Sequence, residues 1–424
     1  MKRPLSFNHY KVLAISSFCS ALEIYNFVIF AYFLNVIGVL FFPPDTPDWL
    51  RQVKVYGLFS IGFFFRPIGG VIIAHYGDIL GRKKIFIFTI ALMALPTLAI
   101  ALMPTYEDIG YYSAALLILF RIMQGCAVGG EGPASLVFVS EHSPASHKNL
   151  SIAAITASIA FGGLLSNIVA TFINSYFTNS EILAGAWRYP FILGSFFIVI
   201  SFLLRRILEE TPVFLSIKNK ILVNQLPIKY SLINHRSAVL FGLAFFSIYA
   251  STTMTLQTLG VSLLPKLFQI SPLLASKLGI SVSIFAIIGH LTFGILADRF
   301  GQLKVLILGL FFLSISAIIY YHKLQDLSEN IFFYLSICGF FIGTISIIPA
   351  LVAMSFPAKV RLSSLALIFG ASTAIFQTSA PVTLSFLSIY NIMSPVYYVS
   401  AFYIIGIFLG IYLLLNNNNL KRIN

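Results

Sequence analysis

The chain has 424 residues, of which 58% are hydrophobic and only 10% charged, and its formal net charge is +13. Soluble proteins average roughly 25% charged residues, so this composition excludes a soluble globular protein. The apolar residues form many runs of about 20, the length that crosses a bilayer, which predicts an all-α polytopic membrane protein. The three cysteines lie in separate apolar runs, which argues against a disulfide framework.

Taken in chain order, the apolar runs predict twelve transmembrane helices. They are expected at residues 12–41, 53–76, 85–104, 110–140, 150–177, 187–207, 237–265, 274–297, 303–322, 330–355, 363–387 and 395–415. The longest polar interruption, 208–236, is the expected linker between an N-terminal six-helix bundle (1–207) and a C-terminal six-helix bundle (237–424).

A short polar turn occurs once in each half. Gly77-Asp78-Ile79-Leu80-Gly81-Arg82 follows the second run, and Ala297-Asp298-Arg299-Phe300-Gly301-Gln302 follows the eighth. Because the repeat lies about half a chain length away, it predicts two pseudo-symmetric bundles that are related by an axis along the membrane normal.

The lysine and arginine residues set the expected orientation. With the N-terminus inside, nineteen of the 27 fall on the inner side, six on the outer side, and only Arg66 and Arg121 lie within spans. The positive-inside rule therefore places both termini in the cytoplasm. The same distribution explains the high net charge without nucleic acid as a partner.

Four charged residues are expected near mid-depth in the membrane: Glu23, Arg66, Arg121 and Glu131. Ionisable groups at this depth are costly unless they are paired or face water, and they mark transport pathways. Structural ion pairs between helices are the alternative interpretation for each residue. Two acids and two bases at one depth favour a proton relay or an anionic ligand, so Glu23 and Glu131 are the proton-coupling candidates.

Further polar residues within the predicted spans are candidates for a central cavity. With Arg66 and Arg121, the predicted cavity set is Asn26, Gln124, Tyr249, Gln257, His290 and Gln377. Polar side chains also join helices in membranes, so packing remains the alternative for each. No metal-ligand cluster and no nucleophile–base pair is evident in the spans, which argues against an enzyme and predicts neither a metal nor a cofactor.

Several motifs together resemble the metabolite:proton symporter branch of the major facilitator superfamily, which includes proline/betaine, shikimate, citrate and α-ketoglutarate symporters. They are Leu22-Glu23-Ile24-Tyr25-Asn26-Phe27, Arg66-Pro67-Ile68-Gly69-Gly70, the Gly77 to Lys83 turn, Arg121-Ile122-Met123-Gln124-Gly125, Gly129-Gly130-Glu131, Trp187-Arg188-Tyr189-Pro190-Phe191 and Leu208-Glu209-Glu210-Thr211-Pro212. The resemblance covers nearly the whole chain and implies the major facilitator fold.

The resemblance also implies a latch at the cytoplasmic gate, for which the expected residues are Gly77, Asp78, Gly81, Arg82, Glu141, Asp298 and Arg299. Gly77 and Gly81 are expected to permit the tight turn, Asp78 to bond the start of a neighbouring helix, and Arg82 to pair with Glu141.

The chain departs from the branch at two functional positions. Asn26 replaces an acid that is usual in the branch and cannot titrate, so either coupling rests on Glu23 alone or with Glu131, or the protein carries a different substrate. Gln302 replaces the arginine that is usual in the second turn, which predicts a weaker latch there.

The sequence thus predicts a monomeric secondary transporter of a bacterial inner membrane, with the lipid bilayer, a proton and a small solute as partners. The expected activity is proton-driven import of a small carboxylated metabolite or zwitterionic osmolyte by alternating access. Export or exchange, uptake of a larger polycarboxylate such as a citrate-based siderophore, and a transport-like sensor are the alternatives.

Overall fold

The computed structural model describes residues 6–217, 227–326 and 329–416. Twelve helical segments in these ranges are long and apolar enough to cross a membrane, which confirms the predicted number of spans. The helices that precede the linker are α1 (Phe7–Tyr32), α2 (Leu34–Phe41), α3 (Asp48–Phe64), α4 (Arg66–Leu80), α5 (Arg82–Leu102), α6 (Tyr106–Ile109), α7 (Tyr111–His142), α8 (Lys148–Tyr176), α9 (Asn179–Ala184) and α10 (Tyr189–Arg206).

The remaining helices comprise α11 and α12, which lie in the linker, and those that follow it. They are α11 (Pro212–Ile217), α12 (Pro227–Asn234), α13 (Arg236–Thr252), α14 (Gly260–Phe268), α15 (Pro272–Phe300), α16 (Gln302–Gln325), α17 (Ile331–Ile342), α18 (Ile347–Met354), α19 (Arg361–Ser372), α20 (Thr378–Tyr390) and α21 (Ser394–Leu415).

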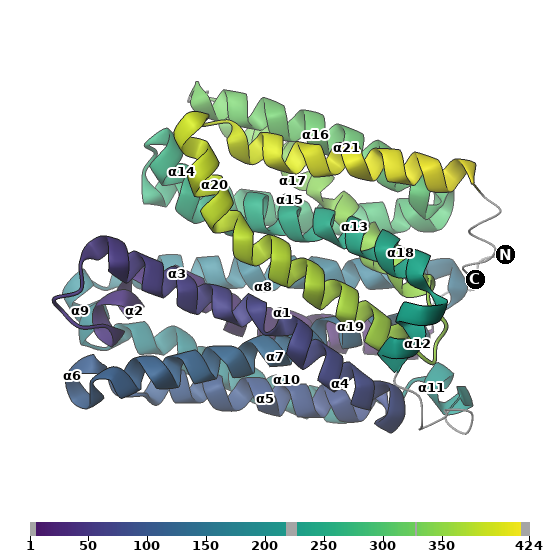
Figure 1. Ribbon diagram of the computed structural model, residues 1–424, viewed down its shortest axis with the longest axis horizontal. Coiled ribbons are helices and arrows are strands. Elements are labelled where there is room, and N and C mark those ends of the chain that lie inside the picture. The colour runs from purple at the N-terminus through teal and green to yellow at the C-terminus, as the bar shows by residue number, and fades with distance from the viewer. Residues whose placement is uncertain (1–5, 218–226, 327–328, 417–424) are drawn as a thin grey trace.

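The long helices lie in two groups, with α1 to α10 in the lower part of Figure 1 and most of α13 to α21 in the upper part. The segment formed by α20 and α19 slants from the upper group down to the lower one, where α19 packs on α4. Helices α11 and α12 lie at the right-hand end, which is called the linker end below. The expected linker is therefore partly helical, and its residues 218–226 lie outside the described part of the chain. Contacts between the two groups run mainly through α4 with α19 and α8 with α15.

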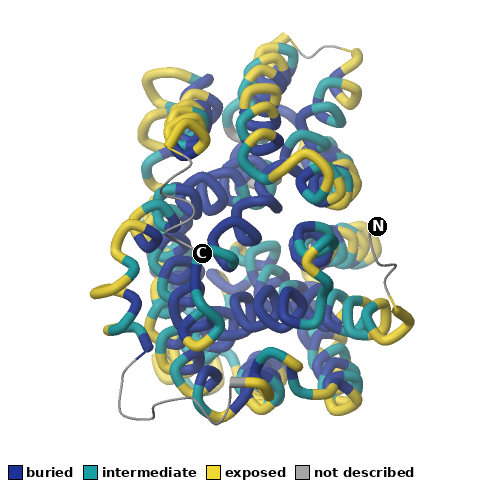
Figure 2. Tube along the Cα trace, turned by 90° about the vertical axis from the view of Figure 1, so that its right-hand side faces the viewer, coloured by how far each residue is buried: buried dark blue, intermediate teal, exposed yellow. Residues whose placement is uncertain are grey.

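The outer surface of the helices is apolar, as a bilayer requires. Large side chains such as Phe88, Leu98 and Phe408 are exposed, whereas the polar and charged residues of the spans are mostly buried between helices. Figure 2, which views the linker end, shows buried segments gathered inside and exposed segments around the outside. Burial of polar groups inside the protein is the arrangement expected where the surrounding solvent is lipid.

The second span is interrupted near its middle. Pro67 has no backbone N–H and restricts the residue before it, and the helix divides at Phe65 into α3 and α4. Arg66 is the first residue of α4, so the interruption places a guanidinium group midway along the span.

Two spans of the second group contain a π-helical turn. One covers Thr253–Thr258, between α13 and α14, and the other covers Thr373–Gln377, between α19 and α20. A π-turn inserts a residue into the helix and is frequent at functional sites. Both turns contribute side chains to the central cavity described next.

Candidate functional site

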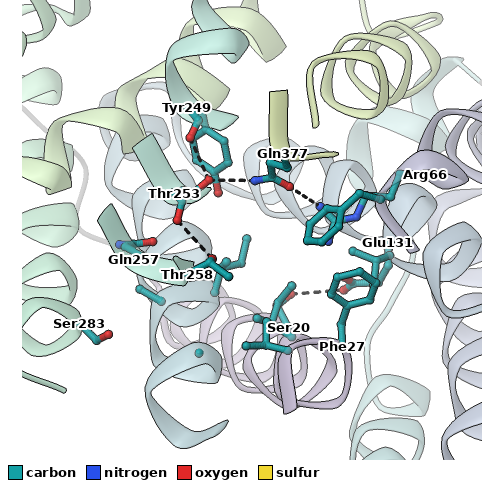
Figure 3. Close-up of a pocket in the computed structure, with 18 of the residues that line it drawn as sticks. Ser20, Phe27, Arg66, Glu131, Tyr249, Thr253, Gln257, Thr258, Ser283 and Gln377 are labelled. Carbon is teal, nitrogen blue, oxygen red and sulfur yellow. Dashed lines mark hydrogen bonds between the residues drawn. The ribbon is translucent and has the colours of Figure 1, made fainter. Parts of the chain in front are cut away.

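A cavity of about 110 Å³ lies between the two groups of helices. Figure 3 shows that its wall brings Arg66, Ser20 and Glu131 from the first group opposite Tyr249, Thr253 and Gln257 from the second. Of the eight side chains predicted to line a central cavity, four are on this wall: Arg66, Tyr249, Gln257 and Gln377.

Arg66 presents a buried positive charge to the cavity. Its side chain pairs with no carboxylate among the described residues, and its Nε atom has no hydrogen-bond partner there. The guanidinium group stacks on two rings of the wall, with its Cζ 4.5 Å from the centre of Phe27 and 4.3 Å from that of Phe63. Stacking on aromatic faces stabilises a cation but leaves donors available, so Arg66 is suited to bind an anion.

A chain of hydrogen bonds joins Arg66 to the opposite group of helices. Its Nη1 donates to the side-chain oxygen of Gln377 at 3.1 Å, and the Gln377 amide donates to the hydroxyl of Thr253 at 2.9 Å. The Thr253 hydroxyl in turn donates to the backbone oxygen of Tyr249 at 2.9 Å. Gln377 and Thr253 belong to the two π-turns, so both turns take part in orienting the arginine (Figure 3).

Glu131 lies on the same wall and accepts hydrogen bonds from two serine hydroxyl groups. Its Oε1 accepts a hydrogen bond from Ser135 at 2.6 Å and one from Ser20 at 3.3 Å. The two serine oxygens are 2.9 Å apart, and both side chains line the cavity. The carboxyl group is therefore connected to the cavity through two side chains that can donate and accept.

The cation that pairs with the two intramembrane acids is Arg205. Its Nη2 lies 3.1 Å from Oε1 of Glu23 and 2.5 Å from Oε1 of Glu131, and all three side chains are buried. The sequence interpretation placed Arg205 among the basic residues of the inner surface, and in this respect it was wrong. Arg205 is the penultimate residue of α10. Its side chain is buried, and the guanidinium Cζ lies 4.4 Å from the centre of the Phe86 ring.

Arg121 and Gln124 are not on the cavity wall, which corrects the prediction for both. Nη1 of Arg121 donates to the side-chain oxygen of Gln124 at 2.9 Å, and Gln124 donates to Thr97 at 3.0 Å. The guanidinium group stacks on Phe27 and Phe30 at 4.5 and 4.3 Å. One turn of helix separates Arg121 from Gln124, so Nη1 bonds within α7, while Nε and Nη2 of Arg121 have no hydrogen-bond partner among the described residues. Arg121 contacts no carboxylate there and does not pair with Glu131.

Asn26 and His290 also lie outside the wall. The Asn26 amide donates to the backbone oxygen of Leu22 at 2.8 Å, in the preceding turn of α1. The imidazole of His290 lies 3.2 Å from the backbone oxygen of Gly343 and is buried between α15 and the 3₁₀ turn that starts at that glycine. Both side chains serve helix packing in this structure.

At the linker end, Asp78 joins the two groups of helices. Its Oδ2 accepts hydrogen bonds from the backbone N–H of Ser363 at 3.0 Å and from the Ser363 hydroxyl at 2.6 Å. Ser363 lies in the first turn of α19, where backbone N–H groups lack partners and a negative charge is stabilising. Asp78 thus bonds the start of a helix from the second group.

Arg82 and Glu141 complete this network. Arg82 lies 3.0 Å from Asp78 and 3.5 Å from Glu141, and it donates to the backbone oxygen of Ala358 at 3.0 Å. Glu141 in turn lies 3.4 Å from Arg361 of α19. The buried charges of the first group are therefore partly paired with groups of the second, and these contacts join the two groups at the linker end.

The second half forms a corresponding contact, in which an acid of the second group of helices bonds the start of a helix of the first group. Asp298 of α15 accepts hydrogen bonds from the backbone N–H groups of Asn149 at 3.1 Å and Leu150 at 3.0 Å, at the start of α8. Gln302 donates to the side-chain oxygen of Asn149 at 2.6 Å, so the residue that replaces the usual arginine still supports this contact.

Two residues assigned to the gate have other roles. Arg299 is exposed and lies over the ring of its neighbour Phe300, 5.3 Å from its centre, so it takes no part in the contact made by Asp298. Gly77 lies within α4 and not in the turn, and its missing side chain leaves room for Leu362. The turn itself is made by Gly81, whose φ of 113° requires glycine.

Comparisons with known proteins agree with this architecture. The family model described as "Sugar (and other) transporter" matches residues 12–225. A putative proline/betaine transporter from Staphylococcus haemolyticus is 31% identical, over 91% of this chain and 84% of its own length. The proline/betaine transporter from Escherichia coli is 28% identical, over 95% of this chain and 82% of its own.

Among solved structures, the proton:xylose symporter XylE bound to 6-bromo-6-deoxy-D-glucose superposes with a TM-score of 0.76. The alignment covers 96% of this chain and 95% of XylE, at 16% sequence identity. The fold is therefore that of XylE, and the curated relatives extend along nearly the whole chain. This chain belongs to the sugar and other transporter family of the major facilitator superfamily and is a membrane transporter.

Proposed function

We propose that this transporter imports a small solute with a single carboxylate, such as proline or a betaine, together with protons. The observation that carries the proposal is Arg66, a buried cation on the cavity wall that pairs with no carboxylate among the described residues. A buried charge without a partner is costly, so a solute carboxylate that completes the pair would bind favourably. The names of the proline/betaine transporters among the relatives support the same solute class.

The wall favours one carboxylate over several. Arg66 is the one arginine among the residues that line the cavity, since Arg121 and Arg205 lie behind the wall. A citrate-like polycarboxylate would bring two or more negative charges to one guanidinium group. The structure therefore gives less support to the polycarboxylate alternative than to a monocarboxylate.

The rest of the wall suits the other end of a zwitterion. Besides the two rings on which Arg66 stacks, the wall includes the aromatic side chains of Tyr32, Phe59 and Phe369. The face of an aromatic ring attracts cations, and quaternary ammonium groups in particular. A betaine could therefore place its carboxylate on Arg66 and its ammonium group among these rings.

The proposed mechanism is alternating access. The positive-inside distribution of lysine and arginine places the linker end in the cytoplasm, so the contacts of Asp78 and Asp298 would close the cytoplasmic side. Proton binding at Glu23 and Glu131, together with solute binding at Arg66, would precede release of these contacts. The membrane is proposed to be a bacterial inner membrane, the protein to act as a monomer, and the proton gradient to supply the energy without a cofactor.

Uptake into proteoliposomes of the purified protein tests the proposal. Labelled proline, glycine betaine, citrate and xylose are presented with and without an inward proton gradient. We expect gradient-driven accumulation of proline or glycine betaine, little uptake of citrate or xylose, and a loss of at least tenfold in Arg66→Gln.

The matched control is Arg206→Gln. Arg206 is an exposed arginine that stacks on Phe202, 4.2 Å from the ring centre, and its substitution should leave uptake unchanged. If the protein accumulated xylose but neither proline nor glycine betaine, the assignment of the solute class would be wrong. Solute exchange that does not respond to the proton gradient would instead indicate an exchanger.

A further inference from the structure

The cluster of Glu23, Arg205 and Glu131 contains two acids and one base. The Nη2 atom of Arg205 contacts Oε1 of Glu23 and Oε1 of Glu131, so both carboxyl groups share one guanidinium nitrogen. Two carboxylates at one site repel each other, which favours a proton on one of them. With one proton the cluster is neutral, and without it the cluster carries one negative charge.

The three groups come from three different helices, and no other charged group in the described part of the chain contacts them. Glu23 is on α1, Glu131 on α7 and Arg205 on α10, with the Cys19 thiol of α1 beside them. Helix α5 contributes only the ring and backbone oxygen of Phe86.

Helix α8, which packs closely on α1, places its one charged residue, Lys148, in its first turn, near Glu141 and Arg361. Arg66 and Arg121 share the ring of Phe27 and contact neither acid. The charge of the cluster therefore depends on its own protons.

The two acids have different access to the cavity. Glu131 lines it and is bonded to Ser20 and Ser135, whereas Glu23 is not among the lining residues. A proton from the cavity would therefore reach Glu131 first. Arg205 and Glu131 could then share that proton with Glu23 without exposing a net charge to the apolar surroundings.

We propose that Arg205 is a positioning residue that joins Glu23 and Glu131 into a single-proton site, so that one proton accompanies each solute. The proposal rests on the proposed function, because it assigns the coupling ion to a defined place. A proton adds to a carboxylate oxygen of the cluster from the cavity, and the same proton leaves when the linker end opens. The cluster alternates between a charge of zero and a charge of minus one.

The charge count predicts the behaviour of three variants. Arg205→Gln leaves two acids without a cation, and both must be protonated to be neutral, so the protons stay bound. Glu23→Gln leaves the Arg205–Glu131 pair, which is neutral without any proton. The double variant Glu23→Gln/Arg205→Gln leaves Glu131 alone, and that single carboxyl group again alternates between zero and minus one.

The experiment measures solute-induced proton uptake and solute accumulation in proteoliposomes, with exchange of the same solute as the test of folding. The probe is proline or glycine betaine, whichever the unaltered protein accumulates. We expect one proton per solute in the unaltered protein and in Arg206→Gln. Each single variant should keep exchange but lose at least tenfold in gradient-driven accumulation. The double variant should recover part of the accumulation and the dependence of transport on pH, which a merely structural arginine would not allow.

The outcomes separate the two proposals. If the unaltered protein moves solute without protons, the proposed function is wrong. If it is coupled but Arg205→Gln accumulates solute as well as Arg206→Gln, or if the double variant exchanges solute but recovers no coupling, the single-proton site is wrong. Should Arg205→Gln fail to fold, Arg205→Lys is measured instead. If Arg205→Lys retains proton-coupled accumulation, the result supports the charge count. If it exchanges solute without proton coupling, the single-proton site is wrong.

Discussion

Asp78 and Asp298 lie in the last turns of α4 and α15, at corresponding positions of the two halves, and each bonds the start of a helix of the other half. Asp78 accepts from the N–H of Ser363 at the start of α19, and Asp298 accepts from those of Asn149 and Leu150 at the start of α8. Two related contacts that run in opposite directions therefore join the two halves at the linker end. Any motion that separates the two groups of helices at this end must break both.

Asp78→Asn and Asp298→Asn should each favour the state that is open at the linker end. A hydrogen bond to a charged group contributes about 1.5–3 kcal/mol, and asparagine retains only part of it, so we expect an increase of roughly tenfold in the open population. The measurement is the rate at which an impermeant maleimide modifies Ala358→Cys, in a background without the three native cysteines.

The matched control for the latch is Asp326→Asn, an exposed acid at the end of α16. It should leave the modification rate unchanged. In the double variant of the two latch acids the effects should add, because the contacts are separate. Equal modification rates in all variants would show that the two contacts do not hold the linker end closed.

Gly81→Ala should destabilise the protein. Gly81 has φ 113° and ψ 152°, a region that is essentially restricted to glycine, and strain there costs about 1–3 kcal/mol. An added methyl group would also meet the carboxylate of Glu210. That carboxylate accepts from the backbone N–H groups of Arg82 and Lys83 at 3.2 Å each. Thermal unfolding in detergent should show a Tm lower by a few degrees.

Gly57→Ala provides the comparison for Gly81→Ala. Gly57 is exposed within α3, and an added methyl group there meets no atom within 4 Å. Alanine is the better helix former, so Tm should stay the same or rise. A similar fall in both variants would mean that the turn conformation is not the cause.

Gln377→Glu should weaken solute binding. The amide oxygen of Gln377 accepts from Arg66 at 3.1 Å, and a carboxylate there would form an internal ion pair in competition with the solute. We expect the KM for uptake to rise roughly tenfold, a change of about 1.4 kcal/mol. Gln257→Glu adds the same charge to the cavity wall without a contact to Arg66. An equal increase in KM for both variants would contradict a specific role for Arg66.

The number of spans could be predicted from the sequence because length and hydropathy alone determine what can cross a bilayer. The placement of Arg66 midway along a span could be anticipated for a similar reason, since this arginine lies within an apolar run, far from its ends. Asp78, Arg82 and Glu141 were identifiable as a group only through their resemblance to a known motif.

The partner of the two acids could not be predicted. Arg205 stands beside Arg206 at the end of an apolar run, and the positive-inside rule treats the two alike. Only the packing of α10 against α1 and α5 determines that Arg205 is buried while Arg206 is exposed. Similarly, Arg121 and Glu131 were expected to share a face of one helix, but Arg121 hydrogen-bonds to Gln124, which is one helical turn away.

The two π-turns have a consequence for how transporters of this kind diverge. Deleting one residue from a regular α-helix rotates everything beyond the deletion by about 100°, which would turn lipid-facing side chains inward. At Thr253–Thr258 or Thr373–Gln377, removal of one residue would convert the π-turn to an ordinary helical turn and exchange the side chains that meet the solute. The cavity therefore has two places at which a change of a single codon in length could alter substrate choice while the rest of the bundle keeps its shape.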